Sequence, residues 1–163
     1  MADIRPESPS VPEILAPIND GYVYAFDAKA TLLWRYDYSR GKPLMYGSEV
    51  VVADLNGDGS PEIIFGTWGE QLGDGHLVIL SSRGEKLYDI ELPNQRENGN
   101  GIGAAVAPTV ADLDGDGTLE ILVLTIDHGL DVYHVPGSSD NCLVWPTGRA
   151  NLLRNGQGPA AKQ

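Results

Sequence analysis

Oxygen-bearing side chains recur at the same positions of two nine-residue segments, residues 54–62 and 112–120. In both segments they occupy positions one, three, five and nine, and glycine occupies position six. Carboxylate and amide oxygens at alternate positions can wrap a hard cation, and the glycine permits a turn that brings the next backbone carbonyl inward. The sequence therefore predicts two cation sites. Their expected ligands are Asp54, Asn56, Asp58, the Ser60 carbonyl and Glu62 in the first, and Asp112, Asp114, Asp116, the Thr118 carbonyl and Glu120 in the second.

The chemistry of these ligands favours Ca²⁺. All of them are oxygen atoms and several are carboxylates, whereas Mg²⁺ prefers a tighter octahedron that retains water. We expect about two Ca²⁺ ions per chain. An EF-hand would need a bidentate glutamate at loop position twelve, where this chain has Phe65 and Val123. The alternative interpretation is that the Asp-Gly and Asn-Gly pairs form plain surface turns, but the repetition of the whole ligand spacing favours a metal.

The two acidic segments belong to a longer internal repeat. Residues 51–64 match residues 109–122 at an offset of 58, and residues 11–15 match residues 60–64 at an offset of 49, in a partial copy that lacks the acidic loop. Each copy continues with short runs rich in Val, Ile, Leu and aromatic residues, the last of them at 142–145 in the third copy. Gly, Asn, Asp, Ser or Pro separate these runs, which is typical of strands and turns.

This repeat predicts an all-β fold of four-stranded antiparallel propeller blades, about three of them, which make an incomplete propeller. Runs such as 50–52 and 121–124 are apolar throughout, which indicates sheets covered on both faces. A two-sheet sandwich with a duplicated loop is the alternative, but a whole unit repeats here. The expected divisions are an N-terminal extension at 1–10, a partial blade at 11–46, blades with calcium loops at 47–102 and 103–146, and a tail at 147–163 as a candidate ring-closing segment.

In residues 51–64 and 109–122, with Phe65-Gly66 and Gly69, the chain resembles the FG-GAP, or VCBS, repeat family of integrin α-subunit propellers and many bacterial secreted proteins. The resemblance covers residues 11 to about 146. It implies a β-propeller with Ca²⁺ in the loop between the first and second strands of a blade. Residues 21–36 are similar to a blade of quinoprotein-type propellers, in which a late tryptophan, here Trp34, locks neighbouring blades. Residues 145–156 resemble the ending of bacterial propellers, so we expect the native C-terminus at this end.

Composition excludes several classes of function. The 163 residues carry 11 basic and 23 acidic side chains, and the net charge of −12 argues against binding to nucleic acid or to an anionic membrane surface. Cys142 is the only cysteine, which excludes an intrachain disulfide and a zinc site built from several cysteines. The first ten residues contain no apolar run that would read as a signal peptide. The longest apolar stretch, at 119–126, is far below the ~20 residues of a membrane helix.

Motifs for catalysis are missing from the sequence. His76, His128 and His134 lie in no recognisable nucleophile or metal motif, and no Gly-x-Ser-x-Gly, Walker or dinucleotide fingerprint occurs. Four aromatic residues near glycines present two interpretations, a binding face or packing between blades, of which packing is favoured. These residues are Tyr36, Tyr38, Tyr46 and Trp68.

The sequence predicts a calcium-binding, non-catalytic propeller segment that acts in protein recognition or in assembly of a larger complex. The alternative is the C-terminal part or a subunit of a propeller enzyme, of the quinoprotein dehydrogenase or polysaccharide lyase type, whose active site lies in other blades. Closed propellers need about four or more blades, so we expect a partner that completes the ring, either another copy of the chain or a different one. Weak calcium sites suit the millimolar calcium outside cells, which predicts a secreted, periplasmic or cell-surface protein.

Overall fold

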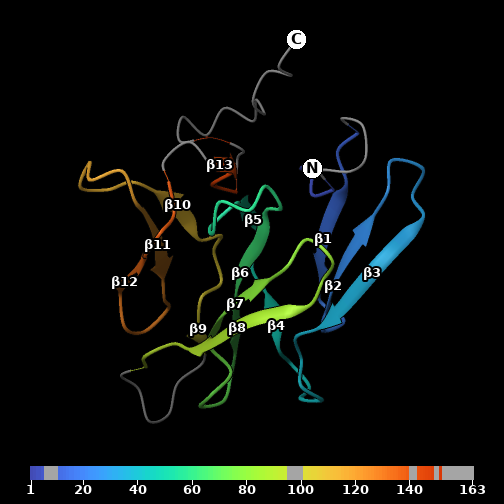
Figure 1. The fold of residues 1–163 in the computed structure, drawn as a ribbon. Coiled ribbons are helices and arrows are strands. Elements are labelled where there is room, and N and C mark those ends of the chain that lie inside the picture. Colours follow the sequence, from blue (N-terminus) through green and yellow to red (C-terminus); the bar gives the residue numbers. More distant parts are fainter. Residues whose placement is uncertain (6–10, 95–100, 140–142, 149–150, 152–163) are drawn as a thin grey trace.

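The protein is all-β, and the computed structural model arranges its antiparallel strands in three sheets that follow one another along the chain (Figure 1). It describes residues 1–5, 11–94, 101–139, 143–148 and 151. Within these residues no helix is long and apolar enough to cross a membrane. The first sheet contains β1 (Ile14–Ile18), β2 (Tyr22–Phe26) and β3 (Leu32–Asp37), and the third contains β10 (Thr109–Ala111), β11 (Leu119–Leu124) and β12 (Leu130–Val135).

The middle sheet is the largest of the three. Its four sequential strands are β5 (Val51–Ala53), β6 (Glu62–Gly69), β7 (His76–Leu80) and β8 (Lys86–Glu91). Two short strands, β4 (Tyr46–Gly47) and β9 (Ile102–Gly103), pair with the last residues of β6. A final strand, β13 (Leu143–Trp145), pairs with β5.

Strands β5, β6 and β7 of the middle sheet are buried on both faces because they lie between the other two sheets. Side chains alternate along β6, so Ile63 packs with the first sheet while Ile64 packs with the third. The end sheets are covered on one face only: in β11, Ile121 is 2% exposed whereas Leu124 is 53% exposed. The apolar run at 121–124 predicts a strand covered on both faces; among the described residues no further sheet covers its outer side, so the second half of this prediction stays a prediction.

Strand β13 differs in position from the sequence prediction, which placed residues 142–145 in the third unit. Leu143 and Trp145 pair with β5 of the middle sheet instead, and the Pro146 carbonyl accepts the Val110 amide of β10 at 2.9 Å. Without β13, the strand β5 would leave one side unpaired, and an unpaired edge readily captures another strand. The third sheet therefore has three strands, and residues 143–146 tie it to the middle sheet.

Aromatic side chains join the first sheet to the middle sheet. Tyr38 is fully buried and its ring centroid lies 6.0 Å from that of Phe65, while Tyr36 lies 6.5 Å from the same ring. The favoured interpretation of Tyr36 and Tyr38 as packing residues is thus confirmed. The remaining pair, Tyr46 and Trp68, stack on each other at 4.6 Å across β4 and β6.

Trp34 makes the most specific contact between these two sheets. Its indole Nε1 donates a hydrogen bond to the Ser82 carbonyl at 3.0 Å, in the turn between β7 and β8. Gly84 in the same turn has φ +80, and a Cβ at this residue would lie 2.6 Å from the Trp34 ring. The turn therefore needs glycine both for its backbone conformation and for the close approach of the indole.

Substituting Gly84 by alanine should displace Trp34 and loosen the first sheet. Gly137→Ala is the matched control, because Gly137 has φ +83 but a Cβ at that residue would meet no atom within 4 Å. Both variants incur about 1–2 kcal/mol of left-handed backbone strain, and Gly84→Ala should lose about 1–3 kcal/mol more through overpacking. Urea denaturation followed by tryptophan fluorescence measures the difference. Equal losses in the two variants would show that the Trp34 contact contributes nothing.

Candidate metal centre

The two acidic loops occupy equivalent places in the fold. Residues 54–61 join β5 to β6, and residues 112–118 join β10 to β11. The glycines at loop positions four and six have φ between +73 and +89 in both loops. L side chains rarely adopt this conformation, so the glycines allow each loop to turn back on itself twice. These four residues are Gly57, Gly59, Gly115 and Gly117.

The same hydrogen bonds hold both loops in shape. The aspartate at position one accepts the amides of positions four and six, at 2.8 and 2.9 Å in the first loop and at 2.7 and 3.0 Å in the second. The side chain at position three accepts the amide of position five, at 2.9 and 3.1 Å. Position five accepts the amide of position seven, Ser60 or Thr118, at 2.7 and 2.8 Å. Each side chain is therefore directed by the backbone of its own loop.

The structure brings three of the predicted ligands of the second loop together. One carboxylate oxygen from each of Asp112, Asp114 and Asp116 lies within 4.8 Å of the other two. Like charges this close repel one another, and a bound divalent cation would remove the repulsion. The hydroxyl and amide of Thr118 hold the pKa of Asp116 below its ordinary value, so this carboxylate stays ionised. In the first loop Asn56 replaces the central aspartate, which makes that donor set less negative by one charge.

The predicted ligands at position nine are buried and contact the backbone of their own loops. Glu62 and Glu120 are 5% and 6% exposed, and Glu120 is not a member of the aspartate cluster. Their Oε2 atoms accept the amides of Leu55 and Leu113, at 2.7 and 2.9 Å. These carboxylates thus tie the second residue of each loop to the strand that follows it.

The second oxygen of each glutamate has a different partner in the two loops. Glu62 Oε1 accepts Asn56 Nδ2 at 3.2 Å, while Glu120 Oε1 lies 3.0 Å from His134 Nδ1. Burial raises the pKa of Glu62 to about 7, and the charges of Asp58 and Asp54 add to this, although the Leu55 amide opposes it. The pKa of His134 is raised chiefly by its hydrogen bond to Glu120. A cation beside Asp58 would favour the ionised form of Glu62.

The first copy of the repeat also has a glutamate that braces its loop in this way: Glu13, in the segment 11–15 that matches residues 60–64. Glu13 is fully buried, its Oε2 accepts the Ile4 amide at 3.0 Å, and its Oε1 lies 2.7 Å from Arg5 Nε. Ala2 pairs with Glu13 through two backbone hydrogen bonds, in the way that Ala53 pairs with Glu62. Residues 1–5, expected to belong to an extension, therefore begin the first copy, with Arg5 at the position of Asn56.

A signal for this arrangement is present in the sequence. Ala2-Asp3-Ile4 matches Ala53-Asp54-Leu55 and Ala111-Asp112-Leu113, but it lies nine residues from its glutamate (Ile4 to Glu13) where the other copies have seven. A search for the acidic spacing alone misses it. Residues 6–10, which would complete this loop, lie outside the described residues.

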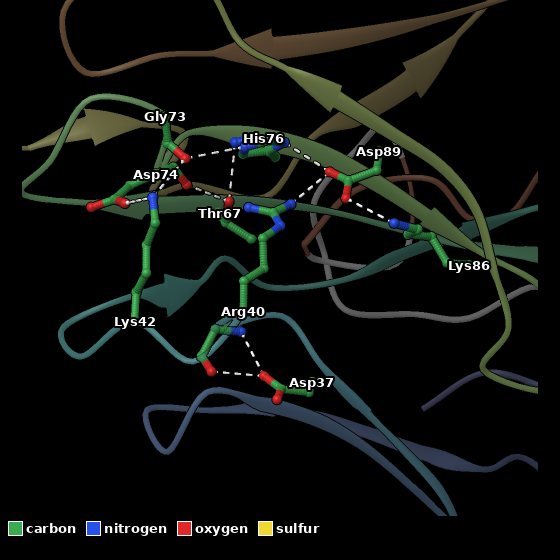
Figure 2. Close-up of polar contacts among 10 residues, drawn as sticks. Asp37, Arg40, Lys42, Thr67, Gly73, Asp74, His76, Lys86 and Asp89 are labelled. Carbon is green, nitrogen blue, oxygen red and sulfur yellow. Dashed lines mark hydrogen bonds and ion pairs between the residues drawn. The ribbon is translucent and has the colours of Figure 1, made fainter.

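A second cluster of titratable residues joins the loop after β3 to the middle sheet (Figure 2). Asp89 on β8 lies 2.6 Å from Arg40 Nη2, 2.7 Å from His76 Nδ1 and 3.2 Å from Lys86 Nζ. Beside it, Lys42 Nζ lies 2.9 Å from the buried carboxylate of Asp74. Each carboxylate of this cluster lies against at least one cation, and these ion pairs hold the loop after β3 against the middle sheet.

Comparison with known proteins adds no family to this geometry. The chain matches no protein-family model, and a search of curated proteins finds no relative. The two acidic loops, whose hydrogen bonds and glycine conformations agree position by position, are therefore the strongest indication of a binding site in the described residues.

Asp89 should make stability depend on acidic pH. Burial opposes its ionisation most strongly, but Arg40, Lys86 and His76 together outweigh this and hold its pKa below the ordinary value. A carboxyl with a lowered pKa stabilises the fold above its unfolded pKa, about 3.9, and this stabilisation disappears as the pH falls through the folded value. Asp89→Asn should therefore cost roughly 1.5–3 kcal/mol at pH 7 and progressively less in strong acid.

Urea denaturation between pH 7 and pH 2 measures this difference, with the exposed Glu70→Gln as a control for the loss of one surface carboxyl. A difference in unfolding free energy between wild type and Asp89→Asn that stays constant as the pH falls would contradict a stabilising role for the charge of Asp89.

Proposed function

We propose that the chain is a calcium-binding, non-catalytic segment of a β-propeller that acts in protein recognition or in assembly of a larger complex. One observation carries the proposal: two loops at equivalent places in successive sheets have the same hydrogen bonds, the same glycine conformations and the same pattern of oxygen side chains. Two independent surface turns would have no reason to agree in all three respects. Three antiparallel sheets packed in series also support blades of a propeller.

In this proposal the side chains at loop positions one, three and five bind Ca²⁺ directly, together with the carbonyl of position seven. These ligands are Asp54, Asn56, Asp58 and Ser60 in one site and Asp112, Asp114, Asp116 and Thr118 in the other. Carboxylate oxygens are hard donors, and Ca²⁺ accepts six to eight of them in flexible geometry, so solvent can complete each site. Glu62 and Glu120 brace the loops from behind and add negative charge beside the ion.

The described titratable clusters support a non-catalytic role. Arg40, His76 and Lys86 each pair with Asp89, and Lys42 pairs with Asp74. Calcium sites of exposed aspartates are suited to millimolar calcium, and we therefore propose a secreted, periplasmic or cell-surface setting.

Titration calorimetry should find two Ca²⁺ ions per chain. Asp58→Ala and Asp116→Ala should each remove one ion, and the double variant should bind none, because each substitution removes a central carboxylate. Asp3→Ala is the control, since Asp3 corresponds to position one of the acidic loops, but in this copy Arg5 replaces the oxygen side chain at position three. Free Ca²⁺ at 100 times Kd should raise the free energy of unfolding by about 2.7 kcal/mol for each occupied site. A chelator should remove this stabilisation. Full binding by the double variant would refute the proposal.

Substituting a bracing glutamate tests whether its carboxylate only supports the loop or also binds Ca²⁺ directly. Glu62→Gln keeps an acceptor for the Leu55 amide but removes the charge. We expect the stoichiometry of two to persist and the affinity of that site to fall by about 10-fold, as for residues that orient ligands. Asp58→Ala measured alongside should abolish the same site. If Glu62→Gln also abolishes it, Glu62 is a ligand in its own right.

A further inference from the structure

The first sheet has an outer face that no other sheet covers in the described structure. Ile14, Ile18 and Leu32 on this face are 38%, 44% and 49% exposed. Beside them the rings of Tyr22, Tyr24 and Phe26 form a ladder along β2, with successive centroids 5.9 Å apart. Apolar and aromatic side chains thus share one continuous sheet surface, since Ile14, Phe26 and Leu32 are neighbours in the strand register.

The third sheet has an uncovered outer face of its own. Leu124, Leu130 and Val132 are 53%, 58% and 50% exposed there, and the register pairs Leu124 with Leu130 and Leu122 with Val132. A hollow of about 460 Å³ opens on this face between β10, β11 and β12 and the neighbouring loops. Thr109, Leu122, Leu124 and Leu130 are among its lining residues. In Figure 1 the first and third sheets lie on opposite sides of the middle sheet.

The repeat shows which way each uncovered face points. The residue after the bracing glutamate faces the preceding sheet: Ile63 packs with the first sheet and Ile121 with the middle sheet. The next residue faces the following sheet, as Ile64 faces the third sheet and Leu15 faces the middle one. By the alternation of side chains, the equivalent residues of the uncovered faces are Ile14 and Leu122.

Within the chain, two interfaces of the same kind join successive sheets. The two uncovered faces therefore correspond to the two different sides of such an interface. Ile14 lies on a face that receives a preceding sheet, and Leu122 lies on a face that receives a following one. The first of these faces carries the aromatic ladder of Tyr22, Tyr24 and Phe26, and the second carries the hollow. Continuity with the two internal interfaces indicates that each face packs against the other type and not against its own.

We propose that the outer face of the third sheet packs on the outer face of the first sheet of a second copy of this chain, and that the second copy does the same in return. The result is a closed, head-to-tail dimer of six sheets. Head-to-tail contacts either close into rings or continue as filaments, and two reciprocal contacts close this ring. The inference rests on the proposed propeller segment, but it depends on the sheet faces and not on Ca²⁺.

Light scattering after size exclusion tests the pairing with charges placed on each face. Wild type should have twice the 17.5 kDa mass of the chain. Leu32→Lys and Val132→Glu should each be monomeric at the same concentration, because either one damages both contacts. An equimolar mixture of the two should regain the dimer, since it contains one unaltered contact and one Lys–Glu contact. Leu72→Lys, at an exposed leucine on the loop between β6 and β7, is the control and should remain dimeric.

A monodisperse wild-type monomer would overturn the proposal, as would a dimer that only one of the two variants disrupts, because that result indicates like faces in contact. A mixture that stays monomeric, or a mass that grows continuously with concentration, would also overturn it. Circular dichroism shows that each variant is folded. Calcium titration of the same samples separates the two proposals: a monomer that binds two ions contradicts only the interface, and a dimer that binds none contradicts only the calcium sites.

Discussion

A buried glutamate at the start of β1, β6 and β11, one strand in each sheet, is the interaction on which the structure depends. Glu62 and Glu120 each accept the amide of the second residue of the preceding loop, and Glu13 accepts that of the equivalent Ile4, at 2.7 to 3.0 Å. A hydrogen bond to a charged group contributes roughly 1.5–3 kcal/mol, and a buried carboxylate without donors would be costly. The contact also fixes the register of the strand. Because side chains alternate, the two residues that follow each glutamate must face the preceding and the following sheet.

The charge around this glutamate is balanced differently in the three copies. In the first, Arg5 lies against Glu13, so the balance is internal to the chain. In the second, the neutral Asn56 contacts Glu62, and burial raises the pKa of Glu62 to about 7. In the third, His134 contacts Glu120, and three aspartates gather beside it. The copy that lacks the acidic spacing therefore has its own cation, Arg5, while the copies that have this spacing leave negative charge that an external cation would balance.

Local patterns predicted the strands and the acidic loops, because both arise from neighbouring residues. Alternating and β-branched runs define β6, β7 and β11, and the Asp-x-Asn-x-Asp-Gly spacing identifies the loop before β6. The pairing of β13 was not predictable in this way, since Leu143–Trp145 suits any free strand edge and only the exposed edge of β5 selects it. The direction of the Glu62 side chain likewise depends on the Leu55 amide, which the fold places, and the spacing of oxygen atoms carries no information about it.

In each repeat, one glutamate connects the apolar cores between the sheets to the loop that precedes its strand. Side chains such as Ile63 and Ile64 lie in the two cores, whereas Asp54 and Asp58 lie at a loop beyond the sheet. Glu62 connects them, because its backbone belongs to β6 and its carboxylate to the loop. An ion that ordered the loop would therefore act on the sheet through this residue and would leave the apolar faces unchanged. Loop and sheet are therefore coupled through Glu62, while the cores on either side of β6 are held by apolar packing.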